Sequence, residues 1–273
     1  MEKQLSGEQL NNLSEADLLI DQGKTHFEHG RFEEAKACFA KALEKRNAVL
    51  GEDDPDCAEA RHFLGLSLAE TNAFEAAEKE FVRSVEIYEK AFYDAHYNLA
   101  PVLMDHAAFL MKAGEWEKAE PLCARAQEIF SKTLNGDHRL IIEATYRLGI
   151  IYRKLAKYPE ALKLFVKVKK AFESPYGPTE EFKYLEALIN QDQGKAKEAE
   201  TAYLEAIKGF EHRRNLPRLA DCLRSYAELL KSQKLSERAD EILAQGRSHR
   251  RESRRSLLLR CTLYLYPAKS LIY

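Results

Sequence analysis

The sequence predicts an all-α protein made of about six consecutive helical hairpins, and two observations lead to that prediction. First, the strong helix formers Ala, Glu, Lys, Leu and Arg dominate the composition, whereas the 273 residues include only 12 Gly and 8 Pro. Second, one pattern of residues recurs six times at nearly constant spacing. Because 45% of the residues are hydrophobic, the chain has enough apolar material for a substantial core.

The repeated pattern is clearest in the segment GRFEEAKACFAKAL at 30–43, which returns as NAFEAAEKEFVRSV at 72–85 and GEWEKAEPLCARAQ at 114–127. Three further copies begin at residues 156, 194 and 234. All six copies share one alanine, found at Ala35, Ala77, Ala119, Ala161, Ala199 and Ala239. These alanines are 42, 42, 42, 38 and 40 residues apart, and three identical steps indicate a structural repeat.

Each copy of the pattern predicts a helix with one apolar stripe. In the first four copies an aromatic residue stands three positions before the shared alanine: Phe32, Phe74, Trp116 and Tyr158. A bulky side chain stands four positions after it in every copy except the third, which has Cys123. A small or modest residue follows three positions later. Offsets of three, four and seven place these residues on one side of a helix.

A second helix is expected to precede each of these stripes. Twelve positions before the alanine the residue is always Gly or Ala, at Gly23, Gly65, Ala107, Gly149, Ala187 and Ala227. Small residues on two successive helices let the helix axes approach closely, with aromatic side chains filling the space between turns. Each unit is therefore expected to be a helical hairpin that buries its apolar stripes by stacking on neighbouring hairpins.

These residues together resemble the tetratricopeptide repeat over about residues 15–247. The 42-residue step exceeds the usual repeat of about 34 residues and is similar to the variant found in kinesin light chains. The resemblance implies a right-handed superhelical solenoid that binds peptides in a concave groove, usually without catalysis. The expected organisation is a flexible N-terminal segment at 1–14, the solenoid at 15–247, and a C-terminal tail at 248–273 that is basic and then apolar.

The resemblance also implies which residues line the groove, because in this family the first helix of each hairpin faces it. The implied positions lie three before, one after and four after the small residue, together with neighbouring basic residues. The candidate peptide-binding residues are Lys24, Phe27, His62, Met104, Met111, Lys112, Tyr146, Arg147, Ile150, Arg153, Lys154, Tyr184, Arg224 and Lys231. Helical spacing alone supports their lying on one side of the helices.

The chemistry of these candidate residues suggests a partner segment that combines acidic and bulky apolar side chains. Methionine and aromatic side chains can adapt to a peptide, and the basic residues beside them favour acidic groups. The alternative is that the charges form a solvated helix face and the methionines fill the core. The function expected is a non-catalytic protein-interaction adaptor or scaffold. A second hypothesis is a peptide-sensing regulator whose solenoid changes pitch when its ligand binds.

The motifs for catalysis and cofactor binding are weak. Gly23, Lys24 and Thr25 read like the end of a phosphate-binding loop, but that motif requires glycine at position 18, where the chain has Leu18. His26, His29 and Cys38 are a conceivable metal site, although ordinary packing or surface histidines are the commoner case. We therefore expect no catalytic residues, no metal and no cofactor.

Charge and cysteine content bear on partners and location. Residues 247–273 have a charge balance of +6, which leaves −8 for residues 1–246, so the acidic body is not expected to bind nucleic acid. The basic tail could contact an anionic surface, cap the solenoid by a helix, or have no function. Five cysteines without a CxxC pair, and the absence of a signal-peptide core or a run of membrane-spanning length, predict a cytoplasmic protein.

Overall fold

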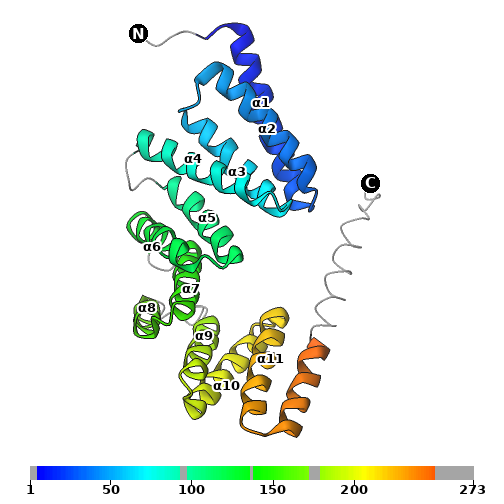
Figure 1. The fold of residues 1–273 in the computed structure, drawn as a ribbon, viewed down its shortest axis with the longest axis vertical. Coiled ribbons are helices and arrows are strands. Elements are labelled where there is room, and N and C mark those ends of the chain that lie inside the picture. The colour runs from blue at the N-terminus through cyan, green and yellow to red at the C-terminus, as the bar shows by residue number, and fades with distance from the viewer. Residues whose placement is uncertain (1–4, 93–96, 136–137, 172–178, 250–273) are drawn as a thin grey trace, which may run out of the picture. The chain divides into compact units, whose positions relative to one another are not determined.

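The computed structural model describes residues 5–92, 97–135, 138–171 and 179–249, and all regular secondary structure in these ranges is helical (Figure 1). The helices alternate between the two members of each expected hairpin. The first helices are α1 (Gly7–Glu28), α3 (Pro55–Glu70), α5 (Leu99–Ala113), α7 (Arg139–Lys154), α9 (Thr179–Asp192) and α11 (Leu216–Ser232). The second helices are α2 (Phe32–Leu50), α4 (Phe74–Phe92), α6 (Trp116–Thr133), α8 (Tyr158–Ala171), α10 (Ala196–His212) and the helical residues 236–249. The predicted all-α repeat architecture is confirmed.

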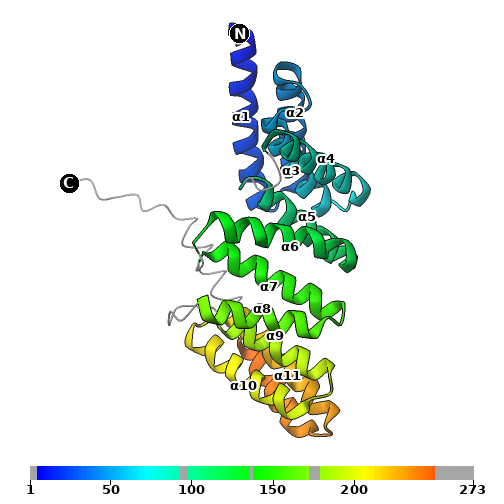
Figure 2. The ribbon, with the colours of Figure 1, turned by 90° about the vertical axis from the view of Figure 1, so that its left-hand side faces the viewer.

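The chain divides into two compact units, where the sequence suggested one solenoid domain. Unit 1, Met1–Leu155, contains α1 to α7, and unit 2, Ala156–Tyr273, contains α8 to α11 and the helical residues 236–249. Within unit 1, each helix packs against the helix that follows it in the sequence, from α1 to α7. Figure 2 shows α6 and α7 of unit 1 side by side.

The shared alanines and the small residues are buried, and within unit 1 they lie where the helices of a hairpin touch. All six alanines are fully buried, and so are Ala107, Ala187 and Ala227. At Gly23 of α1 the space is tightest, because an added Cβ atom would lie 2.5 Å from Cε1 of Phe39 on α2. At Gly65 of α3 the corresponding distance, to Cδ1 of Phe81 on α4, is 3.3 Å. In these two hairpins of unit 1 the sequence pattern thus marks the contact surface.

The turn inside each hairpin uses one residue in the left-handed conformation. These residues have φ between 57° and 83° and are Gly30, Asn72, Gly114, Ala156, Gly194 and Lys234. They follow the same steps as the shared alanines, five residues before each one. A left-handed residue after a helix lets the backbone reverse while its N–H groups still reach the last carbonyl groups. The hairpin turn is therefore a constant part of the repeat.

The N-terminus differs from the sequence expectation, which placed residues 1–14 in a flexible segment. Residues 7–14 form the first turns of α1, because Ser6 and Gln9 form a capping box. The backbone N–H of Gln9 donates to Ser6 Oγ at 3.2 Å, and that of Ser6 donates to Gln9 Oε1 at 2.9 Å. At the other end of the chain, residues 250–273 of the expected tail lie outside the described residues.

Each unit has its own core of apolar side chains. One cluster in unit 1 joins α1, α2 and α3 around the fully buried Phe39, whose ring stacks on Phe63 at a centroid distance of 5.3 Å. The cluster in unit 2 is built around Tyr203, Phe210 and Tyr226, all at most 1% exposed. These cores hold the first helices rigidly enough to present a defined surface.

Candidate functional site

The exposed side of three first helices in unit 1 forms a regular surface, which we call the first-helix face. It consists of four positions that recur at the 42-residue step, lying six and two residues before the small residue and one and five residues after it. Every one of these side chains is partly or largely exposed. They are Glu59, Phe63, Leu66 and Glu70 on α3, Pro101, Asp105, Ala108 and Lys112 on α5, and Glu143, Arg147, Ile150 and Lys154 on α7.

Contacts between successive first helices show that these positions lie beside one another. Lys112 and Glu70 occupy the same repeat position on α5 and α3, and Lys112 Nζ lies 3.2 Å from Glu70 Oε1. Between α5 and α7, the guanidinium of Arg147 donates to the backbone oxygen of Met104 at 3.2 Å. The row Leu66, Ala108 and Ile150 therefore places three partly exposed apolar side chains across α3, α5 and α7.

The candidate residues three positions before the small residue lie deeper than the first-helix face. His62, Met104 and Tyr184 are 7%, 6% and 8% exposed, respectively. His62 Nε2 on α3 lies 2.9 Å from Asp105 Oδ2 on α5, and Tyr184 Oη on α9 lies 2.9 Å from Ser225 Oγ on α11. At this position the side chain packs between successive first helices. Tyr146 is partly exposed and Arg224 is exposed.

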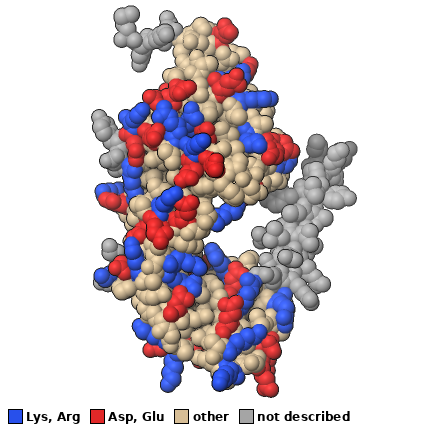
Figure 3. Space-filling model, viewed as in Figure 1, with Lys and Arg blue, Asp and Glu red and all other residues tan. Residues whose placement is uncertain are grey.

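Most of the candidate basic residues have acidic neighbours. Lys24 Nζ lies 3.0 Å from Glu59 Oε1 and 4.6 Å from the centre of the Phe63 ring. Arg147 pairs with Glu143 at 2.6 Å, and in unit 2 Arg224 pairs with Asp221 at 3.4 Å. Lys231 Nζ lies 3.9 Å from Asp240. Figure 3 shows acidic and basic side chains intermixed on one side of the molecule.

The pKa of the Glu59 carboxyl group shows the effect of its ion pairs with basic residues. Burial by itself would raise the pKa of Glu59, but hydrogen bonds from Lys24 and Arg46 outweigh it and leave the pKa below its ordinary value. Arg46 is 5% exposed and also pairs with Asp17 at 2.9 Å, so it links α2 to α1 and α3. This network fixes the edge of the first-helix face.

The remaining candidates are placed as follows. Phe27 is partly exposed and makes an edge-to-face contact with Phe32 at 5.2 Å between ring centres. Met111, Ile150 and Arg153 are partly exposed. Lys154 is exposed, and its Nζ lies 5.7 Å from the centre of the Trp116 ring.

A pocket of about 200 Å³ opens on the first-helix face between α5 and α7. It contains two of the candidate residues, Met104 and Arg147. The other residues that line it are Pro101, Asp105, Phe130, Leu140 and Glu143. Phe130 belongs to α6 and is 1% exposed, so it lies at the bottom of a recess whose sides come from α5 and α7.

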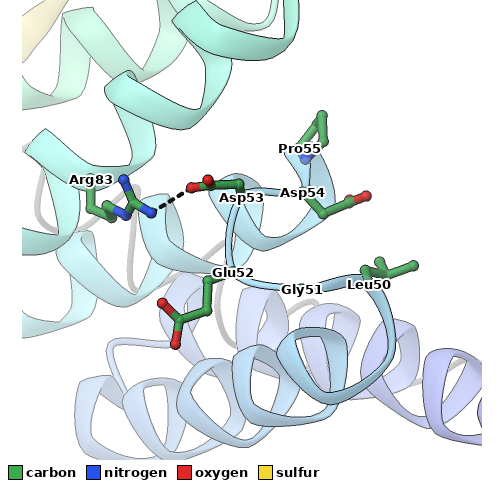
Figure 4. A pocket seen from close by; sticks show the side chains of 7 residues that line it. All are labelled: Leu50, Gly51, Glu52, Asp53, Asp54, Pro55 and Arg83. Atoms are coloured by element: carbon green, nitrogen blue, oxygen red, sulfur yellow. Dashed lines mark hydrogen bonds and ion pairs between the residues drawn. The ribbon is translucent and has the colours of Figure 1, made fainter.

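A larger pocket, of about 430 Å³, lies at the loop between α2 and α3, lined by residues 50–55 and Arg83 (Figure 4). Two of its three acidic residues serve the fold. Asp53 pairs with Arg83 of α4, and Asp54 caps α3 by accepting a hydrogen bond from the backbone N–H of Asp56 at 2.9 Å. Figure 4 shows Glu52 pointing away from the pair of Asp53 and Arg83. We regard this loop as a structural element.

Other side chains that could react or bind a metal are either buried or far from one another. Burial raises the pKa of the Cys57 thiol to about 11 and that of the Cys123 thiol to about 12, so both thiols are poor nucleophiles. Across the described ranges, no three His, Cys, Asp or Glu side chains come together as a metal site would require. No helix within the described part of the chain combines the length and apolar character needed to cross a membrane.

Of the residues six and two positions before the small residue, sequence reasoning selected only Arg147 and missed the others, among them Asp105 and Glu143. The signal was available, because these positions continue the 3-4 spacing backwards from Ala108 and Ile150. The burial at His62 and Met104 was harder to foresee, since it depends on how closely successive first helices approach. The pairing of basic with acidic residues depends on the same distance.

Solved structures with similar folds include other repeat proteins of low sequence identity. One is a structure of nearly identical tetratricopeptide-like repeats described as kinesin light chain from Podosopora anserina, with a TM-score of 0.67 and 17% identity, covering 75% of this chain and 98% of that one. The apo form of RapI matches with a TM-score of 0.65 and 17% identity, covering 89% and 85%. A Rap protein complexed with competence and sporulation factor matches with a TM-score of 0.58 and 15% identity, covering 91% and 66%.

The sequence comparisons identify the family. No curated protein matches the chain. The family model described as tetratricopeptide repeat matches residues 14–90 and 98–174, which together make up more than half of the chain. These matched ranges contain α2, α3 and α5 to α8 completely and all but the last two residues of α4, with the shared alanines and small residues of the first four repeats. The chain therefore belongs to the tetratricopeptide repeat family.

Proposed function

We propose that the protein is a non-catalytic adaptor that binds a partner segment on the first-helix face of unit 1. The observation that carries this proposal is the row Leu66, Ala108 and Ile150, which remains partly exposed across three rigid helices. Such a row suits the bulky apolar side chains of an extended segment. The structural neighbour complexed with competence and sporulation factor supports a peptide ligand for this type of fold.

Acidic side chains of the partner are proposed to bind beside this row, at Lys112 and Lys154. Both lysines are exposed, and the side chain of Lys112 is 57% exposed in its pair with Glu70. Exposed ion pairs contribute only about 0–1 kcal/mol, so the partner's carboxylate can displace Glu70 at little cost. Arg153 adjoins Lys154 on α7 and adds to the positive charge.

Ile150→Glu is expected to weaken partner binding at least about tenfold, because it places a charge in the middle of the apolar contact. The binding probe is a set of peptides selected from a random phage-displayed library on the full-length protein, with affinities measured by fluorescence polarisation. Val82→Glu is the matched control, since Val82 is 43% exposed but lies on α4, a second helix. Equal affinities for both variants and the unmodified protein would contradict the placement of the site.

Charge reversal at the two lysines tests the proposed acidic contact separately. Lys112→Glu combined with Lys154→Glu is expected to weaken selected peptides that contain Asp or Glu by about tenfold, and to leave their Asn or Gln counterparts nearly unchanged. The control is Lys132→Glu, an exposed lysine on α6 that pairs with Glu128. Identical losses for acidic and amide peptides would show that the lysines do not contact the partner's carboxylates.

A further inference from the structure

We propose that the pocket between α5 and α7 receives a lysine or arginine side chain of the partner segment. This inference rests on the proposed function, because the pocket opens on the same first-helix face. It adds a required basic side chain in the partner, whereas Lys112 and Lys154 require only acidic ones. The partner would combine a basic side chain at the pocket with apolar and acidic side chains farther along the face.

The size of the pocket suits one side chain. Its volume of about 200 Å³ is smaller than the roughly 300–1,000 Å³ typical of sites for small-molecule ligands. Met104, Phe130 and Leu140 provide apolar walls from three different helices. The aliphatic stem of a long basic side chain packs favourably against such walls while its charged end stays near polar groups.

The charges of the pocket favour a cation. Its lining contains two carboxylates, Asp105 and Glu143, and one guanidinium, that of Arg147. The guanidinium is already engaged, because it donates to the backbone oxygen of Met104 at 3.2 Å and to Glu143 Oε1 at 2.6 Å. The pocket therefore has an excess of one negative charge and little positive charge available for an acidic ligand.

One oxygen of each carboxylate remains available to a ligand. Asp105 uses Oδ2 for His62 Nε2 at 2.9 Å, and Glu143 uses Oε1 for Arg147. Within the described part of the chain, Asp105 Oδ1 and Glu143 Oε2 accept no hydrogen bond. An apolar side chain in the pocket would take these oxygens out of water without a donor, which is unfavourable. A guanidinium or ammonium group would supply the missing donors in charge-assisted hydrogen bonds.

The helix geometry also sets the spacing of the partner's charges. Asp105 and Lys112 are seven residues apart on α5, which corresponds to about 10 Å along the helix axis. The basic group of a bound segment at the pocket and its acidic group at Lys112 are therefore expected to lie roughly 10 Å apart.

The test is a comparison of matched peptides on matched variants of the full-length protein. Peptides selected from the random phage-displayed library are synthesised with their arginine either retained or replaced by citrulline, which has nearly the same shape but no charge. The pocket variant is Asp105→Asn combined with Glu143→Gln, whose amides can still accept the bonds from His62 and Arg147. The control variant is Glu86→Gln combined with Glu128→Gln, which removes two exposed charges on the second helices α4 and α6, outside the first-helix face.

The expected result is that citrulline weakens binding to the unmodified protein and to the control variant at least about tenfold. On the pocket variant, the arginine and citrulline peptides should bind within about twofold of each other. A citrulline effect of equal size on all three proteins would overturn the assignment, because the arginine would then bind elsewhere. A selection without Lys or Arg enrichment would also overturn it.

Two further outcomes separate this inference from related possibilities. If Ile150→Glu abolishes peptide binding but no basic residue is preferred, the proposed function stands and only the pocket assignment fails. If Ile150→Glu has no effect on peptides that depend on arginine, the proposed function fails as well. A last variant of the full chain replaces four arginines of the basic tail by Gln: Arg250, Arg251, Arg254 and Arg255. If this variant binds arginine peptides more tightly than the unmodified protein, the chain's own tail competes for the pocket. That result would overturn the assignment of the pocket to an external partner alone.

Discussion

Gly23→Ala is expected to lower the free energy of unfolding by about 2 kcal/mol, although alanine normally favours a helix over glycine by about 1 kcal/mol. The added Cβ atom would lie 2.5–2.9 Å from three ring carbon atoms of Phe39. The ring is fully buried and stacks on Phe63, so it has little room to move aside. Chemical denaturation monitored by circular dichroism measures the change.

Gly65→Ala provides the matched control for this prediction. It occupies the same repeat position, but its nearest neighbour would be the Phe81 ring at 3.3 Å, a distance that a shift of a few tenths of an ångström relieves. Its helix-propensity gain and packing cost should nearly cancel, leaving the stability within about 1 kcal/mol of the unmodified protein. Equal destabilisation by both substitutions would contradict the prediction, because it would show that the helices pack equally closely at Gly23 and Gly65. Phe39→Leu added to Gly23→Ala should recover part of the loss.

Lowering the pH from 7 to 5 is expected to remove about 2 kcal/mol of stability through His106 alone. Burial, with a smaller contribution from the charge of Lys118, lowers the pKa of His106 to about 4. The side chain is 6% exposed, lies against the Phe81 ring at 5.4 Å between ring centres, and neither ring nitrogen has a hydrogen-bond partner within the described part of the chain. The unfolded chain takes up a proton near pH 6.5, whereas the folded protein resists it until about pH 4, so acid favours unfolding.

The comparison variant for this effect is His106→Leu, which fills similar space without a titrating group. Its stability should stay nearly constant between pH 7 and pH 5, before most carboxylates titrate. At pH 7 it should be close to the stability of the unmodified protein, because leucine removes two buried nitrogens that lack partners. Parallel stability curves for the two proteins over this pH range would rule out His106 as the source.

The sequence was sufficient to predict the hairpins because their determinants are local. The alanines from Ala35 to Ala239 and the small residues from Gly23 to Ala227 mark contacts within one hairpin, and a fixed spacing along the chain records them. The capping box at Ser6 and Gln9 is equally local and could have been recognised from the sequence. Overlooking it placed the start of α1 several residues too late.

The candidate site was less predictable because it depends on contacts between hairpins. Met104 and Arg147 were selected from the sequence, and the structure brings both to one pocket. Asp105 and Glu143, which give that pocket its charge, were not selected, because the family pattern drew attention to other helix positions. The pairing of Lys112 with Glu70 joins residues 42 positions apart, and no local pattern specifies that their atoms meet.

The packing of neighbouring helices also has a consequence for how the protein folds. Within unit 1, the extensive contacts join helices that are consecutive in the sequence. Short-range contacts of this kind require little loop closure, so such chains fold rapidly and folding can start at any hairpin and spread to its neighbours. Among the described residues of unit 1, the sparsest contact between consecutive helices joins α4 to α5, so the helices on either side are expected to separate there at the lowest energetic cost.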